Sequence, residues 1–182
     1  GLVDGFDVAS GGELELALAA GVDAGRISFA GPGKRDRELE RAISLGVTLN
    51  SESEGEVARA LAIGAKLGIK PRLAVRVNPS FDLKGSGMKM GGGAKQFGVD
   101  AERVPALVKR IIAAGAEWRG FHIYAGSQAL KADAIIEMQA QTLALVAELT
   151  DAIGVSPPHV NLGGGFGIPY FPGDEPVDLK AV

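Results

Sequence analysis

The sequence predicts a parallel α/β protein, and an incomplete (β/α)8 TIM-type barrel with about six β/α units is the architecture that we expect. Short apolar segments of strand length alternate with longer segments of helical periodicity. Parallel neighbours need a crossover connection, and a helix after each strand supplies it. A doubly wound sheet would give the same alternation. A barrel normally needs about 250 residues, so the 182 residues here would make most of one.

The first β/α unit illustrates how its elements are recognised. Residues 6–9 form an apolar segment of strand type, and Ser10 with Glu13 has the spacing of a helix capping box. Gly21 then ends the helix, as Gly68 ends a later one. The strands expected after the first are residues 26–30, 47–50, 72–77, 119–123 and 160–162.

Apolar residues at helical spacing predict the core-facing sides of the helices. Residues 78–98 interrupt the alternation with an unusually long connection, which we expect to be functional. The clearest helical stripe is Val104, Leu107, Val108, Ile111 and Ile112. Shorter stripes are Leu39, Ala42 and Ile43, then Val57, Leu61 and Ala65, and finally Ile135, Met138, Thr142, Leu145 and Leu149.

Composition limits the classes of function. The chain is 46% hydrophobic and 23% charged, typical of one globular domain over residues 1–182. Its net charge of -3 favours neither nucleic acid nor a membrane surface as partner, so we expect small-molecule ligands. It has no cysteine, and we expect neither a targeting nor a membrane-spanning segment, and a cytoplasmic protein. Two isolated histidines and scattered acids predict no metal site.

Polar residues gather directly after the predicted strands, where parallel β/α proteins bind ligands. Gly163, Gly164 and Gly165 follow the last strand, and their backbone N–H groups can approach an anion together. Ser127 can add a hydroxyl donor from the neighbouring strand end. A tight turn is the alternative explanation of a glycine run. Its position after a barrel strand favours a phosphate site.

Three further side chains are candidates for this site. His122 and Tyr124 are two apart in a predicted strand, so they share one side and can line a pocket together. His122 is either a general acid or base or a core histidine, and Tyr124 either stacks on a flat ligand or packs in the core. Arg76 ends an apolar strand and therefore needs an anionic partner, for which we predict Asp7.

Several segments in order carry a resemblance to a known family: residues 5–13, 27–34, 75–79, 97–98, 122–128 and 162–167. Together they resemble the fold-type III decarboxylases of the alanine-racemase-like barrel, which include diaminopimelate and ornithine decarboxylases and depend on pyridoxal 5'-phosphate. The resemblance implies a barrel that binds this cofactor, and a full protein that decarboxylates an amino acid and forms a homodimer.

The resemblance also implies roles for matching residues. Ser127 and Gly165, with the two preceding glycines beside it, would bind the cofactor phosphate. Asp7 and Arg76 would order the site near the pyridine ring. Where the family usually stacks a histidine on the ring, this chain has Tyr124, which cannot become a cation near neutral pH. Any role of the family histidine as an imidazolium cation would be lost in this chain or would move to His122.

Residues 87–93 are similar to a subgroup that includes exosortase-associated decarboxylases and enzymes that act on glutamate tethered to an acyl carrier protein. The implied substrate is therefore a small-molecule amino acid or an amino acid bound to a carrier protein. No lysine here matches the family's Schiff-base motif, which the resemblance places on a strand ahead of residue 1. We also find no match to its last barrel strand or to its C-terminal β-domain.

We therefore expect no catalytic residue in this chain and no decarboxylation by it alone. Two alternatives remain open. One is a racemase or a non-catalytic pyridoxal-phosphate-binding protein of the same barrel type. The other is a phosphate-binding barrel without pyridoxal phosphate.

Overall fold

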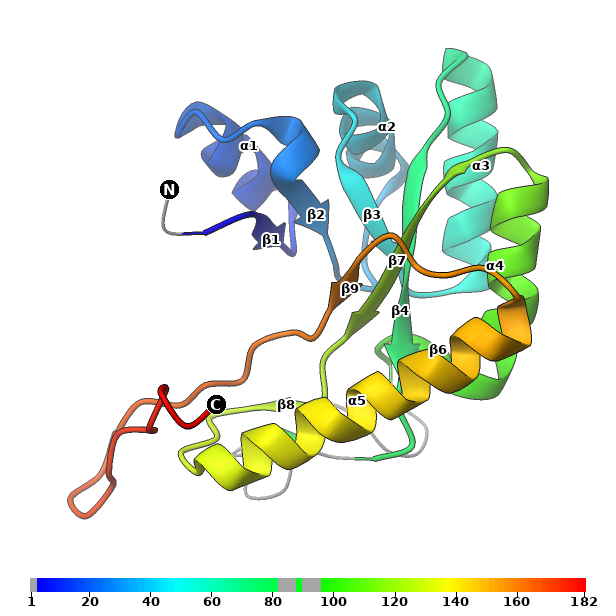
Figure 1. The fold of residues 1–182 in the computed structure, drawn as a ribbon. Coiled ribbons are helices and arrows are strands. Elements are labelled where there is room, and N and C mark those ends of the chain that lie inside the picture. Colours follow the sequence, from blue (N-terminus) through cyan, green and yellow to red (C-terminus); the bar gives the residue numbers. More distant parts are fainter. Residues whose placement is uncertain (1–2, 82–87, 90–95) are drawn as a thin grey trace.

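A computed structural model of the chain describes residues 3–81, 88–89 and 96–182 (Figure 1). The strands are β1 (Phe6–Val8), β2 (Ile27–Phe29), β3 (Thr48–Ser51), β4 (Arg72–Asn78), β5 (Met88–Lys89), β6 (Val99–Asp100), β7 (Glu117–Ile123), β8 (Gly126–Ser127) and β9 (Val160–Asn161). The α-helices are α1 (Gly11–Ala19), α2 (Asp36–Leu45), α3 (Glu54–Leu67), α4 (Val104–Ala113) and α5 (Ala132–Ile153). Two short 3₁₀ helices are η1 (Ala24–Arg26) and η2 (Ala101–Arg103).

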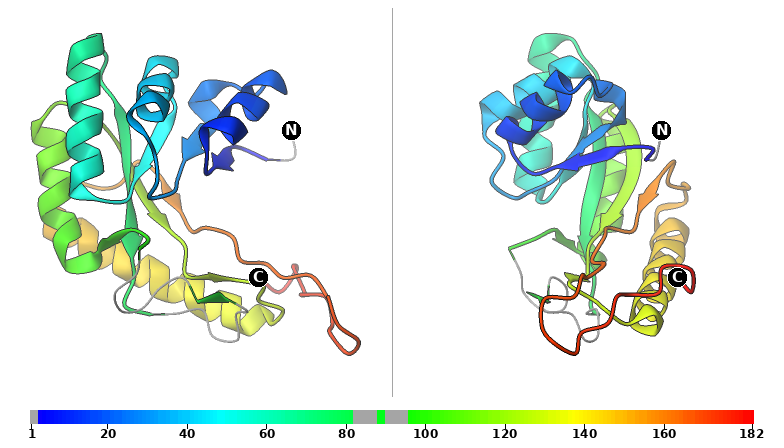
Figure 2. Two further views of the ribbon diagram at one scale, coloured as in Figure 1. Left: turned by 180° about the vertical axis from the view of Figure 1, so that it is seen from behind. Right: turned by 90° about the vertical axis from the view of Figure 1, so that its left-hand side faces the viewer.

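Seven strands form one parallel sheet in the order β1-β2-β3-β4-β7-β9, with β6 paired to β4. The order never reverses along the chain, whereas a doubly wound sheet reverses at its switch point. The sheet curls, and the helices cover its outer face (Figures 1 and 2). The expected parallel architecture and the incomplete barrel are therefore confirmed.

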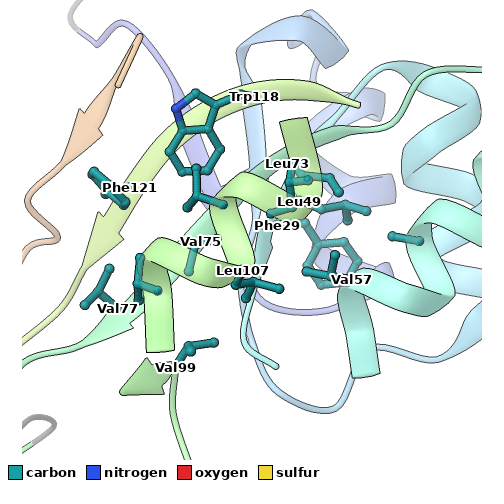
Figure 3. Packing of buried hydrophobic residues seen from close by; sticks show 14 of the residues in the cluster. Phe29, Leu49, Val57, Leu73, Val75, Val77, Val99, Leu107, Trp118 and Phe121 are labelled. Atoms are coloured by element: carbon teal, nitrogen blue, oxygen red, sulfur yellow. The ribbon is translucent and has the colours of Figure 1, made fainter. Parts of the chain in front are cut away.

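The hydrophobic core lies between the outer face of the sheet and the helices (Figure 3). Phe29, Leu49 and Leu73 from neighbouring strands are fully buried there, with Leu107 of α4 packed nearby. Trp118 of β7 contacts Phe121 edge to face, with 5.3 Å between ring centroids. Burial of these side chains supplies most of the drive for the helices to dock on the sheet.

The prediction that a helical residue faces the core is wrong at two positions. Ile112 is 38% exposed, because the buried side of α4 is complete with Val104, Leu107, Val108 and Ile111 and the next position turns toward solvent. Ala65 is also exposed, because α3 is rotated so that Gly64 faces the core instead.

The inner, concave face of the sheet is polar. Paired residues of parallel strands point to the same side of a sheet. Asp7 pairs with Ser28, Arg76 pairs with His122, and His122 pairs with Asn161. The predicted site residues of the strands therefore belong to one face, which is the interior of the incomplete barrel.

Candidate functional site

The segment after β7 and the glycine loop after β9 lie against each other at the carboxyl ends of the strands. The N–H of Ala129 donates to the carbonyl of Gly165 at 2.9 Å, and the N–H of Gly167 donates to the carbonyl of Ala129 at 2.8 Å. The Gln128 amide reaches the carbonyl of Ile168 at 2.5 Å. These bonds bring half-buried Ser127 and the glycine loop into one region, as the sequence predicted.

The glycine loop needs glycine at two of its three positions. Gly163 and Gly165 have φ angles of 73° and 100°, a region that other residues rarely adopt. A Cβ at Gly163 would lie 2.7 Å from Cδ2 of Tyr124 and 2.8 Å from the carbonyl oxygen of Ile123. The glycine therefore lets the loop pass directly over the tyrosine. Gly164 has open space around it.

The loop fits a bound phosphate group. The Gly163 N–H is used internally, donating to Oδ1 of Asn161 at 2.9 Å. Among the described residues, none accepts a hydrogen bond from the N–H of Gly164 or Gly165. Donors without an internal partner, in a loop that lacks side chains, are what an anion requires.

Arg76 has a different partner from the one that the sequence predicted. Its Nη1 donates to Oε1 of Glu52 at 3.2 Å, and both side chains are buried, at 8% and 1% exposed. Asp7 instead accepts hydrogen bonds from the Ser28 hydroxyl and from Nδ2 of Asn161, the latter at 2.7 Å. Glu52 follows the strand next to β4, whereas Asp7 lies three strands away in the sheet order. Proximity across the sheet therefore decides the pairing.

Two aromatic rings flank the Arg76 guanidinium. Its Cζ lies 4.9 Å from the ring centroid of Phe97 and 5.9 Å from that of Tyr124. Such contacts are favourable because the ring faces are electronegative. The Tyr124 ring is thus held between Arg76 and the glycine loop, where it can present a flat surface to a ligand.

His122 is buried, and its Nδ1 has no hydrogen-bond partner in the part of the chain that the structure describes. Burial, followed by the nearby positive charge of Arg76, lowers the pKa of His122 to about 4, although Asp7 and Glu52 oppose this shift. The imidazole is therefore neutral near pH 7. Its burial is that of a core histidine, and a role as a general acid or base stays a prediction.

The concave face below these residues forms an open pocket of about 400 Å³. Asp7, Ser28, Asn50 and Asn161 contribute polar groups to its lining. Asn50 donates to the Ser28 hydroxyl at 3.0 Å, which extends the Asp7 network across β3. Within residues 3–81, 88–89 and 96–182, no three acidic or histidine side chains cluster closely enough to hold a metal ion.

Glu52, Phe97 and Asn161 are neighbours of the site to which the sequence assigned no individual role. A carboxylate directly after an apolar strand was the available signal for Glu52, since such a group needs a partner when buried. The contact of Phe97 with Arg76 is a tertiary contact, and local periodicity does not predict it. Most of the Gly- and Met-containing stretch at 87–93 lies outside the described residues.

The fold and the glycine loop together define the class: an α/β-barrel domain with a glycine-rich loop at the carboxyl ends of its strands. Within that class, the chain belongs to the family of pyridoxal-dependent decarboxylases, whose pyridoxal binding domain model matches residues 2–182. The cofactor of this family is pyridoxal phosphate. None of the helices in the described ranges is both long and apolar enough to cross a membrane.

Known relatives agree with this assignment. The chain is 37% identical over 180 residues to the L-glutamyl-[BtrI acyl-carrier protein] decarboxylase of Niallia circulans, covering 98% of this chain and 42% of that protein. It is 39% identical over 173 residues to the diaminopimelate decarboxylase of Pseudomonas fluorescens, covering 91% and 41%. The chain thus spans less than half the length of these relatives.

Solved structures give the same result. Diaminopimelate decarboxylase from M. jannaschii in complex with L-lysine superposes with a TM-score of 0.82 at 30% identity, covering 93% of this chain and 40% of that one. The Helicobacter pylori enzyme in complex with L-lysine gives a TM-score of 0.78 at 34% identity, covering 90% and 42%.

Proposed function

We propose that residues 1–182 form part of the cofactor-binding barrel domain of a pyridoxal-phosphate-dependent amino-acid decarboxylase. The observation that carries this proposal is the glycine loop: its N–H groups at Gly164 and Gly165 have no acceptor among the described residues, and the loop is hydrogen-bonded to the segment that follows Ser127. Membership in the family supports the same conclusion. The alternatives are a racemase or a non-catalytic pyridoxal-phosphate-binding protein of the same barrel type, and a phosphate-binding barrel without pyridoxal phosphate.

In this proposal the loop binds the cofactor phosphate. The N–H groups of Gly164 and Gly165 donate to its oxygens, Gly163 permits the close approach to Tyr124, and the Ser127 hydroxyl adds a donor. When bound, the cofactor supplies an electron sink for the decarboxylation of the amino acid.

The pyridine ring would lie against the Tyr124 ring, with Arg76 fixed behind it. Arg76 keeps its positive charge, so it favours electron-rich groups on that side of the site. His122 is neutral near pH 7 and therefore adds no second positive charge there. Asp7, held by Ser28 and Asn161, supplies the negative charge on the concave face.

The proposed substrate is an amino acid, either free or bound to an acyl carrier protein. Both kinds occur among the relatives, one of which is named for a carrier-bound glutamyl group. We further propose a homodimer, because the segment after β9 exposes large apolar side chains that a partner would cover. These are Phe166, Ile168, Tyr170 and Phe171. A cytoplasmic location stays a prediction.

Titration of the chain with pyridoxal phosphate, followed by calorimetry, tests the proposed site. Ser127→Ala should weaken binding by about tenfold, because it removes a hydrogen bond to a charged group. Ser156→Ala, at an exposed position after α5, serves as the matched control and should change nothing. Unchanged affinity of Ser127→Ala would count against the site. A wild-type chain that binds inorganic phosphate but not pyridoxal phosphate would favour the barrel without this cofactor.

A further inference from the structure

Glu52 gathers hydrogen-bond donors from three different parts of the sheet's carboxyl edge. Its Oε1 accepts from the N–H of Gly31, after β2, and from Arg76 on β4 at 3.2 Å. Its Oε2 accepts from the N–H of Gly98, directly before β6, at 3.2 Å. These partners are separated from Glu52 by 21, 24 and 46 residues in the sequence. One carboxylate therefore connects strand β4 with the loops at Gly31 and Gly98, all of which border the site.

A buried carboxylate is costly unless donors compensate it, and here both oxygens are used by the protein. The Glu52 side chain is 1% exposed, so it does not face a ligand. Its geometry instead determines where its partners lie. Arg76 is the partner whose position matters most for the site, because its guanidinium packs against the rings of Phe97 and Tyr124.

A second buried ion pair, Lys34–Glu56, lies beside the Gly31 loop. Nζ of Lys34 donates to Glu56 at 2.8 Å and to the carbonyl of Gly31 at 2.7 Å. Gly31 is thus held through its carbonyl by Lys34 and through its N–H by Glu52. Burial raises the pKa of Glu56, and Lys34 opposes that shift. The two buried carboxylates and Lys34 therefore fix the Gly31 loop beside Glu52.

We propose that Glu52 is a positioning residue for the ring side of the cofactor site. It orients Arg76, and Arg76 in turn sets the position of the Tyr124 ring. Among the described residues, Glu52 makes no hydrogen bond with Ser127 or with the glycine loop, the phosphate side of the site. This inference rests on the proposed function, since it assumes that the Tyr124 ring faces the pyridine ring.

The test compares two ligands on the same protein. Glu52→Gln keeps the shape of the side chain but removes its charge and turns one oxygen acceptor into a donor. Pyridoxal phosphate should bind about tenfold more weakly, because a charged hydrogen bond is lost, while inorganic phosphate should bind as before. Glu54→Gln is the matched control, since Glu54 pairs only with Arg103 at the surface among the described residues, and both affinities should stay unchanged.

A second measurement needs no ligand. The Tyr124 ring resonances in the NMR spectrum, assigned with Tyr124→Phe, should move in Glu52→Gln and not in Glu54→Gln. Glu52→Asp keeps the charge on a shorter side chain and should recover part of the affinity for pyridoxal phosphate. It also serves as the test variant if Glu52→Gln does not fold.

The outcomes separate the two proposals. Equal weakening of both ligands would give Glu52 a general structural role and would overturn the inference. If the Tyr124 resonances do not shift in Glu52→Gln, the inference is overturned as well, whatever the two ligand affinities are. A wild-type chain that does not bind pyridoxal phosphate, but whose Tyr124 resonances respond to Glu52→Gln, would overturn the proposed function and leave only the Glu52–Arg76–Tyr124 coupling standing.

Discussion

His122 lies in surroundings unlike those of an exposed histidine. It sits on the concave face beside Arg76, buried, with Nδ1 lacking a described partner. Burial and the arginine charge both favour the neutral imidazole. Because His122 is uncharged, it places no second positive charge beside Arg76 in the interior.

This environment predicts a pH dependence of stability. The folded-state pKa of about 4 lies below the ordinary 6.5, so between these values the unfolded chain binds a proton that the folded chain does not. The free energy of unfolding should therefore fall as the pH drops from about 6.5 to about 4, by roughly 3 kcal/mol from this group. Urea denaturation across that range measures the slope.

His122→Gln is the comparison for that experiment, because it cannot titrate. Its stability should fall less steeply over the same pH range. Equal slopes for both proteins would show that His122 does not carry the effect. Glu38, whose pKa is lowered by the backbone N–H groups of Arg35 and Gly11, contributes only at the acid end of this range, because its ordinary pKa is 4.5.

At the scale of a single element, α3 shows how two glycines of one helix differ. Ser53 caps its start by accepting from the Glu56 N–H at 3.1 Å, and Gly68 ends it in the left-handed conformation. Gly64 is buried where the helix meets the chain that leads into β4. Gly55, in the first turn, is exposed and has no close neighbour.

Alanine substitutions at these two glycines should have opposite effects. A Cβ at Gly64 would lie 2.7 Å from the carbonyl oxygen of Ile69 and 2.8 Å from Cδ of Pro71, and a backbone carbonyl cannot easily move. We expect Gly64→Ala to lower the free energy of unfolding by about 1–2 kcal/mol, because the clash outweighs the gain in helix propensity. Gly55→Ala should raise it by up to about 1 kcal/mol. Thermal denaturation followed by circular dichroism distinguishes them, and a stabilised Gly64→Ala would contradict the close approach.

For the whole molecule, one hydrogen bond joins the two edges of the sheet. Nδ2 of Asn161 on β9 donates to Asp7 on β1 at 2.7 Å, across 154 residues of sequence. β1 and β9 stand at opposite ends of the strand order, so this contact exists only because the sheet curls. The same Asn161 also accepts from the N–H of Gly163, which links the curl of the barrel to the glycine loop.

Asn161→Asp tests that contact selectively. The new carboxylate can still accept from Gly163, but it replaces the amide donor with a charge that repels Asp7. We expect a loss of about 1 kcal/mol in the free energy of unfolding at pH 7, since the pair is partly exposed. Combining it with Asp7→Asn exchanges the two partners and should restore most of the loss. A double-mutant cycle with no coupling would show that the contact does not hold the edges together.

Local pattern was sufficient for most of the architecture. Strand and helix periodicities predicted the six strands that follow one another in the sheet order, and Ser10 does cap α1 by accepting from the Glu13 N–H at 3.2 Å. Boundaries were less accurate. The second expected strand began at Arg26, which instead ends η1, because Asp23 caps that turn through the Gly25 N–H at 2.7 Å.

The sequence by itself determined the alternation of strands and helices, the parallel sheet and the glycine loop after β9, because each depends on residues close together in the chain. Only the tertiary structure decided that Arg76 pairs with Glu52 and that Asp7 pairs with Ser28 and Asn161. The physical reason is that a buried charge takes the partner that strand order and sheet curvature bring within hydrogen-bonding distance, and neither property is encoded in local periodicity.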